Sequence, residues 1–219
     1  MGGIVIAAAL ALLSGAAQAQ ILVFEFLDEG LIEHADMVAQ VACRENPEGC
    51  DIYQFPNLHE EGIKQEVQEF VGEFPVVNMS FGVTLRERPA FDYKYDYAKE
   101  LEQWEEDNRI LQNGFDFLTE LVVNNPEVLF VAASGNGEDL GMAQGNGYNI
   151  TDKKPMYPAL IDAPNMVTVA AINQQPGFTV PVDEVFLTDY SNFSLFTVDV
   201  AAPVGPMRDG SFYEGTSFA

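Results

Sequence analysis

The stretch Glu127-Val128-Leu129-Phe130-Val131-Ala132-Ala133, followed by Ser134-Gly135-Asn136-Gly137, indicates the fold class of this chain. Its apolar run is short, contains branched and aromatic side chains, and ends in small polar residues, which is typical of a strand buried on both faces. Strands of this kind occur in parallel sheets that helices cover. The stretch therefore predicts an α/β domain with an internal sheet.

Comparable apolar runs lie on both sides of this stretch. They predict further buried strands at 165–171 and 21–27, the latter interrupted only by Glu25, a strand at 74–82 and a short last strand at 196–203. Between these strands, apolar spacing or polar composition predicts helices at 34–42, 62–73 and 111–124. The charged segment 85–113 predicts a solvated helical face. This alternation predicts a mostly parallel central sheet flanked by helices.

The charge of the chain is strongly negative. The 219 residues include 34 Asp and Glu against 10 Lys and Arg, a net charge of −24. This balance excludes nucleic acid and anionic membranes as partners, because both require a basic face. It is typical of a solvated secreted surface, and adaptation to high salt is the alternative interpretation. The length fits one domain.

Residues 1–19 are interpreted as a signal peptide. An apolar run from Ile4 to Leu13 precedes the small-residue site Ala17-Gln18-Ala19, which predicts cleavage before Gln20. The alternative, a transmembrane anchor, needs about 20 apolar residues. We therefore expect a secreted or periplasmic protein, with the folded domain over 20–219 and no membrane partner after cleavage.

The two cysteines, Cys43 and Cys50, flank a turn-forming loop at 44–49. In an exported protein this spacing predicts a local disulfide. Two thiols and two histidines, His34 and His59, are too few to indicate a metal site.

Four polar residues stand at predicted strand ends or helix starts. Asp28 follows the first strand, His34 begins a helix, Asn136 follows a strand, and Ser217 lies in a Gly-Thr-Ser turn. The carboxyl ends of parallel strands are where open α/β sheets build their sites. These residue types can act as an orienting carboxylate, a general base, an oxyanion donor and a nucleophile.

Five motifs in order make residues 21–219 resemble the subtilisin-like serine proteases, whose triad has the chain order Asp, His, Ser. The motifs are Val77-Asn78-Met79-Ser80-Phe81-Gly82, Val131-Ala132-Ala133-Ser134-Gly135-Asn136, Tyr157-Pro158-Ala159, Asp199-Val200-Ala201-Ala202-Pro203 and Gly215-Thr216-Ser217-Phe218-Ala219. The resemblance implies a three-layer architecture and secreted endopeptidase activity on polypeptide substrates.

The resemblance also implies roles for individual residues. Ser217 would attack the scissile carbonyl, His34 would transfer the proton, and Asp28 would orient the imidazole. Asn136 and the backbone N–H of Ser217 would bind the oxyanion.

Two segments would bind the substrate. Ser80-Phe81-Gly82 would pair with an extended peptide, and Ala133-Ser134-Gly135 would line the first specificity pocket, where small residues leave room for a large apolar side chain. The chemistry would require no cofactor. Structural calcium is an expectation from the family alone, because the chain has no dense ligand motif such as an EF-hand loop.

The chain departs from the family pattern around the histidine. The family usually has Asp-Ser/Thr-Gly and His-Gly-Thr-His, where this chain has Asp28-Glu29-Gly30 and His34-Ala35-Asp36-Met37, only 34 − 28 = 6 positions apart. An alternative is therefore a catalytically impaired, subtilase-like module that binds extended peptides. Because Ala219 comes two residues after the serine, we expect the peptidase domain to be incomplete at its C-terminus.

Two other classes fit less well. An unrelated secreted α/β binding protein would have to match all five ordered motifs by coincidence. An α/β-hydrolase esterase would carry Gly-x-Ser-x-Gly around its serine, and Ser217 has no such surroundings.

Overall fold

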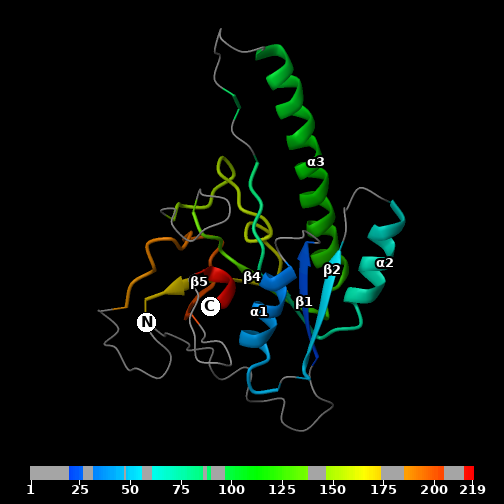
Figure 1. Ribbon diagram of the computed structural model, residues 1–219, viewed down its shortest axis with the longest axis vertical. Helices are drawn as coiled ribbons and strands as arrows, with labels where there is room; N and C mark the ends of the chain where they lie inside the picture. Colours follow the sequence, from blue (N-terminus) through cyan, green and yellow to red (C-terminus); the bar gives the residue numbers. More distant parts are fainter. Residues whose placement is uncertain are drawn as a thin grey trace.

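A computed structural model describes residues 20–26, 32–46, 48–55, 61–85, 88–89, 97–137, 147–173, 185–204 and 215–219. Its centre is a sheet of six parallel strands in the order β2-β1-β3-β4-β5-β6 (Figure 1). The strands are β1 Ile21–Phe26, β2 Cys50–Phe55, β3 Val76–Met79, β4 Leu129–Ala133, β5 Met166–Ile172 and β6 Val200–Pro203. The predicted α/β class with a parallel sheet is confirmed.

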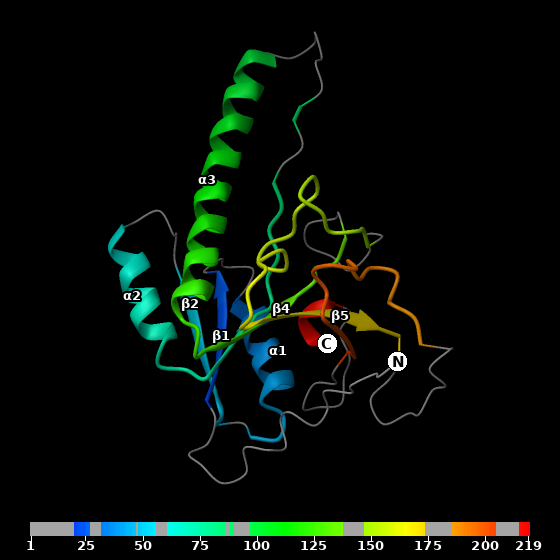
Figure 2. The same cartoon turned by 180° about the vertical axis from the view of Figure 1, so that it is seen from behind.

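The connections place helices on both faces of the sheet. The chain passes from β1 through α1 (Ile32–Ala42) to the edge strand β2, then through α2 (Glu61–Val71) back to β3 on the other side of β1. Crossovers between parallel strands are right-handed, so this reversal puts α1 and α2 on opposite faces. Helix α3 (Tyr97–Asn124) connects β3 to β4, a crossover in the same direction across the sheet as that of α2, and therefore covers the same face as α2 (Figure 2).

Strand β1 divides its side chains between the two layers. Leu22 and Phe24 are buried with α2 and α3, whereas Val23 is buried with α1 and with Phe218 of the short 3-10 helix η3 (Thr216–Phe218). Successive residues of a strand point to opposite faces. Glu25 therefore shares the face of Val23 and points toward α1 and η3.

Only the C-terminal half of α3 belongs to the core. The helix has 28 residues and is therefore about 42 Å long. Its buried residues begin at Phe115 and include Phe117, Leu118, Leu121 and Val122. The N-terminal half projects beyond the sheet (Figures 1 and 2).

The structure differs from the sequence-based elements in two places. The edge strand β2 was not predicted, because the segment after Cys50 carries no continuous apolar run and exposes Ile52. The charged segment 85–113 and the helix at 111–124 overlap one helix, α3, that begins at Tyr97.

The disulfide between Cys43 and Cys50 is formed, with Cα atoms 5.8 Å apart. It joins the residue after α1 to the first residue of β2. The proposed signal peptide, residues 1–19, lies outside the described residues. Across the described part of the chain, no helix combines the length and apolar character needed to span a membrane.

Candidate functional site

The carboxyl ends of three strands and the first turns of two helices lie together at one edge of the sheet. The sheet changes direction at β1, which has β2 on one side and β3 on the other, and ligands of open α/β sheets bind outside the carboxyl ends at such a switch point. Glu25 on β1, Ser80 after β3 and Asn136 after β4 lie at these ends. Helices α1 and η3 supply His34 and Ser217.

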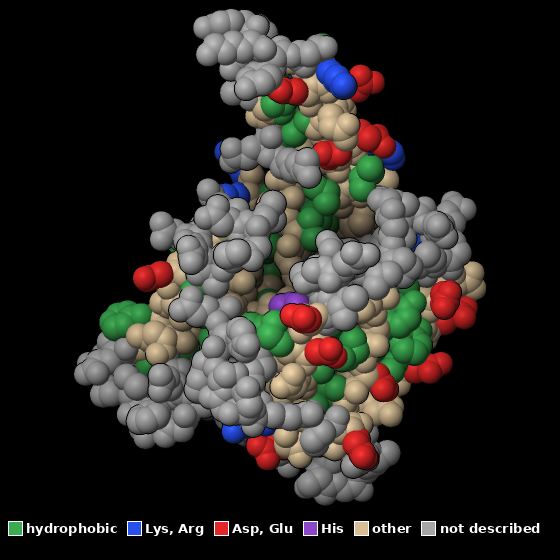
Figure 3. Space-filling model, viewed as in Figure 1, with side chains coloured by type: hydrophobic (Ala, Val, Ile, Leu, Met, Phe, Trp, Pro, Cys, Tyr) green, Lys and Arg blue, Asp and Glu red, His purple; other side chains and the backbone are tan. Residues whose placement is uncertain are grey.

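Glu25 and His34 form a close pair. His34 Nδ1 lies 2.7 Å from Glu25 Oε2, and the glutamate has no exposed surface. A carboxylate buried in a strand requires such a partner, because the low-dielectric interior penalises an unpaired charge. The histidine side chain retains 22% exposure, and the one histidine of the described residues reaches the surface of the face in Figure 3.

The carboxylate that contacts His34 is thus not the one expected from the sequence. Asp28, which the family resemblance favoured, lies outside the described residues. The signal for Glu25 was the single acidic interruption of an otherwise apolar strand. The role of this glutamate becomes visible only when side chains alternate between the two faces of β1 and α1 packs on the face that holds Glu25.

The imidazole of His34 is held from two sides. Besides the Glu25 contact at Nδ1, its ring lies 5.8 Å, centroid to centroid, from the ring of Phe218 at an interplanar angle of 57°. A proton shared between Nδ1 and the carboxylate leaves Nε2 as the nitrogen that can accept a proton. Phe218 directly follows Ser217, so the histidine lies against the segment that carries the serine.

Ser217 and Ser80 are tied to each other. The Ser217 hydroxyl donates to the backbone oxygen of Ser80 at 2.7 Å, and Ser80 Oγ lies 3.3 Å from the backbone oxygen of Ser217. Ser80 Oγ also lies 2.7 Å from Asn78 Oδ1. The hydroxyl of Ser217 is therefore bonded to the β3 segment and not to His34.

Asn136 is oriented by the residue before the serine. Its Oδ1 accepts hydrogen bonds from the backbone N–H of Thr216 at 2.8 Å and from Thr216 Oγ1 at 2.9 Å. Thr216 Oγ1 in turn accepts from the backbone N–H of Gly135 at 3.0 Å. With Oδ1 occupied, Nδ2 is the free donor of the amide, and no described residue accepts a hydrogen bond from it.

Gly215 precedes the turn that carries Ser217. Its φ of 148° is in a region that residues with a Cβ rarely adopt, and an added Cβ would lie 3.5 Å from Asn136 Nδ2 and from the Phe218 ring. There is room for such a Cβ, so the backbone conformation of the turn, and not its closeness to Asn136, favours glycine here.

The predicted specificity pocket is filled by the chain itself. An added Cβ would lie 2.7 Å from Met156 Sδ at Gly82 and 2.8 Å from Met156 Cε at Gly135. The thioether of Met156, itself buried, therefore occupies the space between these two glycines. In this structure Met156 thus lies where the small residues were expected to leave room, and a pocket for a large apolar side chain stays a prediction.

The other predicted binding residues have mainly structural contacts. Phe81 is buried in the core, with its ring 6.3 Å from that of Phe24. Ala133 and Ser134 are buried, and Ser134 Oγ donates to the backbone oxygen of Asn192 at 2.9 Å. Of the predicted peptide-binding residues, Ser80 contacts Ser217 and Gly82 is exposed.

Asn192 was missed by the sequence analysis. It is fully buried, and its Oδ1 accepts hydrogen bonds from the backbone N–H groups of Gly137 and Tyr148, both at 3.0 Å. Its own N–H donates to the oxygen of Gly135 at 2.9 Å. Asn192 thus braces the turn that positions Asn136, a role for which the sequence contains no distinctive signal.

Among the described residues, no three His, Cys, Asp or Glu side chains gather as metal ligands would. Structural calcium stays a prediction.

No protein-family model, curated protein or solved structure matches the chain.

Proposed function

We propose that this chain is a secreted serine endopeptidase that resembles the subtilisin-like proteases and acts through Ser217, His34 and a carboxylate. The observation that carries the proposal is the pairing of His34 with the buried Glu25 beside the segment that holds Ser217. An isolated His–Glu contact is compatible with many structural roles. Its position at the carboxyl edge of the sheet, next to a partly exposed serine and an oriented asparagine, favours catalysis.

The proposed reaction assigns one role to each group. Ser217 Oγ attacks the scissile carbonyl while Nε2 of His34 takes its proton, and the Glu25 carboxylate stabilises the resulting imidazolium. Asn136 Nδ2 and the backbone N–H of Ser217 donate to the oxyanion. The imidazolium then protonates the leaving amine, and water releases the acyl group by the same steps in reverse. Glu25 replaces Asp28 as the orienting residue in this assignment.

Substrate binding would free the nucleophile. The Ser217 hydroxyl now donates to the oxygen of Ser80, in the segment proposed to pair with an extended peptide. A peptide N–H that took this acceptor would release the hydroxyl toward His34. Catalytic hydrogen bonds that form only in the substrate complex are common in enzymes.

The same hydrogen bond supports a second candidate function. A serine held by Ser80 and not by His34 is also what a non-catalytic module that binds extended peptides would contain. In that module the Glu25–His34 pair would serve only to attach α1 to the sheet.

Labelling with a fluorophosphonate probe distinguishes the two. We expect the purified protein to be labelled, and Ser217→Ala and His34→Ala to be unlabelled. His34→Ala removes the partner of a buried carboxylate, so its folding must be checked by circular dichroism. Absence of labelling in a folded wild-type protein would refute the catalytic proposal and favour the peptide-binding module.

Export is part of the proposal. The apolar N-terminal stretch and the disulfide between Cys43 and Cys50 both fit an oxidising compartment outside the cytosol. Western analysis of secreted and cell-retained fractions, with a variant lacking residues 1–19, tests this assignment. Equal export of both forms would contradict it.

A further inference from the structure

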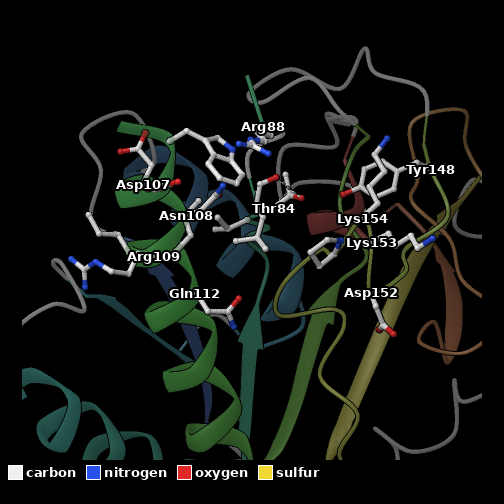
Figure 4. A pocket seen from close by; sticks show the side chains of 17 residues that line it. Thr84, Arg88, Asp107, Asn108, Arg109, Gln112, Tyr148, Asp152, Lys153 and Lys154 are labelled. Carbon is white, nitrogen blue, oxygen red and sulfur yellow. Dashed lines mark hydrogen bonds between the residues drawn. The ribbon is translucent and has the colours of Figure 1, made fainter. Parts of the chain in front are cut away.

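A cavity of about 1200 Å³ lies between α3 and the segment around Tyr148 (Figure 4). One wall is the projecting part of α3, which contributes Trp104, Asn108 and Gln112, and the opposite wall is the segment around Tyr148 and Lys154. The chain after β3, at Val83 and Thr84, lies between the two walls. The cavity therefore offers aromatic surface, amide groups and a hydroxyl to a ligand.

The cavity is unusually basic for this protein. Its 17 lining residues include four bases, whereas the whole chain has ten in 219. The acids are not enriched, with three of 17 in the lining and 34 of 219 overall. The bases are Arg88, Arg109, Lys153 and Lys154. With four bases against three acids, the lining has a net charge of about +1, whereas the whole chain has −24, so this cavity is less hostile to an anionic group than the rest of the protein.

Two of the bases, Lys153 and Lys154, lie on the wall opposite α3. Arg109 is already bonded twice to Glu106, at 2.8 and 2.6 Å, and points away from the cavity in Figure 4. Lys154 Nζ lies 4.2 Å from the centroid of the Tyr148 ring. Backbone hydrogen bonds in both directions between Thr151 and Lys154, at 3.2 and 3.0 Å, close a turn that holds Lys153 at its tip. The turn thus fixes the backbone at Lys153, and the Tyr148 ring contacts the side chain of Lys154, before any ligand arrives.

The cavity is continuous with the proposed peptide-binding strand. Val83 is three residues from Ser80, whose oxygen binds the Ser217 hydroxyl, a chain distance of about 10 Å. Lys154 precedes Met156 by two residues, or about 7 Å, and Met156 lies between Gly82 and Gly135. Because Val83 lines the cavity, a peptide that extends along Ser80–Gly82 toward Val83 would reach the cavity within a few residues of its scissile bond.

We infer that this cavity is a specificity site that receives an acidic side chain of the polypeptide substrate, recognised by Lys153 and Lys154. That the ligand is a substrate rests on the proposed function. That the ligand is acidic rests on the charge and geometry of the cavity.

The test compares matched peptides that carry Glu or Gln at each of four positions on either side of the cleaved bond. In the wild-type protein we expect the Glu peptide to have a kcat/KM about three- to tenfold higher at one or two positions, as two partly exposed ion pairs would produce. The double variant Lys153→Gln/Lys154→Gln should bring this ratio to about one. Arg44→Gln, which removes an exposed base outside the cavity lining, should leave it unchanged.

Three results would overturn the inference. They are a wild-type protein without acidic preference, a double variant that retains the preference, and an Arg44→Gln variant that loses it equally. If the double variant does not fold, the single variant Lys153→Gln, which changes an exposed side chain, replaces it.

Failure of the proposed function would be recognised separately. Fluorophosphonate labelling reports on Ser217 without using the cavity. If labelling and turnover are both absent, the same peptides are titrated against the protein by fluorescence anisotropy. Tighter binding of Glu peptides that the lysine changes abolish would support the acidic site without catalysis, and equal binding of Glu and Gln peptides would overturn it.

Discussion

His34 Nδ1 lies 2.7 Å from Oε2 of Glu25, a glutamate with no exposed surface near the carboxyl end of β1. This contact makes Glu25, and not Asp28, the carboxylate that we propose orients the His34 imidazole. Glu25→Gln keeps the shape but removes the charge that stabilises the imidazolium, so we expect the rate of fluorophosphonate labelling to fall by about 10²–10⁴. Asp28→Asn should change it by less than about threefold. Labelling rates of the two purified variants provide the measurement.

Folding is the control for this comparison, because the amide that Glu25→Gln introduces can still accept a hydrogen bond from His34. Urea unfolding should show both variants folded under the labelling conditions. A larger loss in Asp28→Asn than in Glu25→Gln would assign the orienting role to Asp28 instead.

Thr216 connects the serine turn to the asparagine. Thr216→Val has nearly the same shape but loses the Oγ1 bonds to Gly135 and Asn136, which should cost about 1–3 kcal/mol in the free energy of unfolding. Labelling should also slow, though by less than the roughly 10²–10³ expected for Asn136→Ala. Thr216→Ser, which keeps the hydroxyl, is the matched control. Unchanged stability and labelling in Thr216→Val would show that this link is unimportant.

Met156 closes the space between Gly82 and Gly135, and its removal should reopen a pocket. In Met156→Ala we expect peptides with a large apolar side chain at the cleaved bond to gain roughly tenfold or more in kcat/KM relative to peptides with alanine there. Truncating a buried methionine costs about 2–5 kcal/mol, so stability must be followed. Met166→Ala, at a buried site in the main core, is the control for destabilisation alone. An equal change of preference in both variants would refute the pocket assignment.

Most of the strands that could be predicted lie inside the sheet, and β6, a partly exposed edge strand, is the exception. Apolar runs such as 129–133 and 166–172 are visible without any tertiary information, because both faces of these strands meet helices or loops. Strand β2 lies at the sheet edge and exposes Ile52, so its sequence resembles a loop. The order β2-β1-β3 also could not be predicted, since it depends on where α1 and α2 pack.

The candidate site was only partly predictable. His34, Asn136 and Ser217 were identified from local motifs, because their roles are linked to short turns next to strands. Glu25 was not, since its contact with His34 arises only when α1 folds back onto β1. Met156, which fills the space between Gly82 and Gly135, lies 74 positions after Gly82 in the chain. Sequence patterns carry no information on packing over such a separation.

The disulfide between Cys43 and Cys50 should stabilise the protein without controlling its chemistry. The cysteines are seven positions apart, and closing so short a loop contributes about 2–3 kcal/mol in the chain-entropy description. His34 lies in the first turn of α1, at the opposite end from Cys43. We therefore expect the Cys43→Ser/Cys50→Ser variant to unfold at lower urea concentration but to keep its labelling rate below that concentration.

Reductant provides the control for this prediction. Dithiothreitol should lower the unfolding midpoint of the wild-type protein to that of the double serine variant and should not affect the variant. A loss of labelling in the folded, reduced protein would show instead that the disulfide positions His34.

Tyr157 should make stability depend on alkaline pH. Its ring stacks on Phe115, with centroids 4.0 Å apart, and burial, followed by the carboxylates of Asp116 and Asp152, raises its pKa above the ordinary value of 10.0. Above about pH 10 the unfolded chain therefore loses the phenol proton before the folded protein does, so the stability that depends on the neutral phenol is lost as the pH rises through the folded-state pKa. Tyr157→Phe keeps the stacked ring and removes the titration. We expect the variant to match the wild-type protein at about pH 8 and to lose less stability between about pH 10 and 11.5, measured as urea unfolding midpoints. Parallel curves for the two proteins would contradict the assignment of this pH dependence to Tyr157.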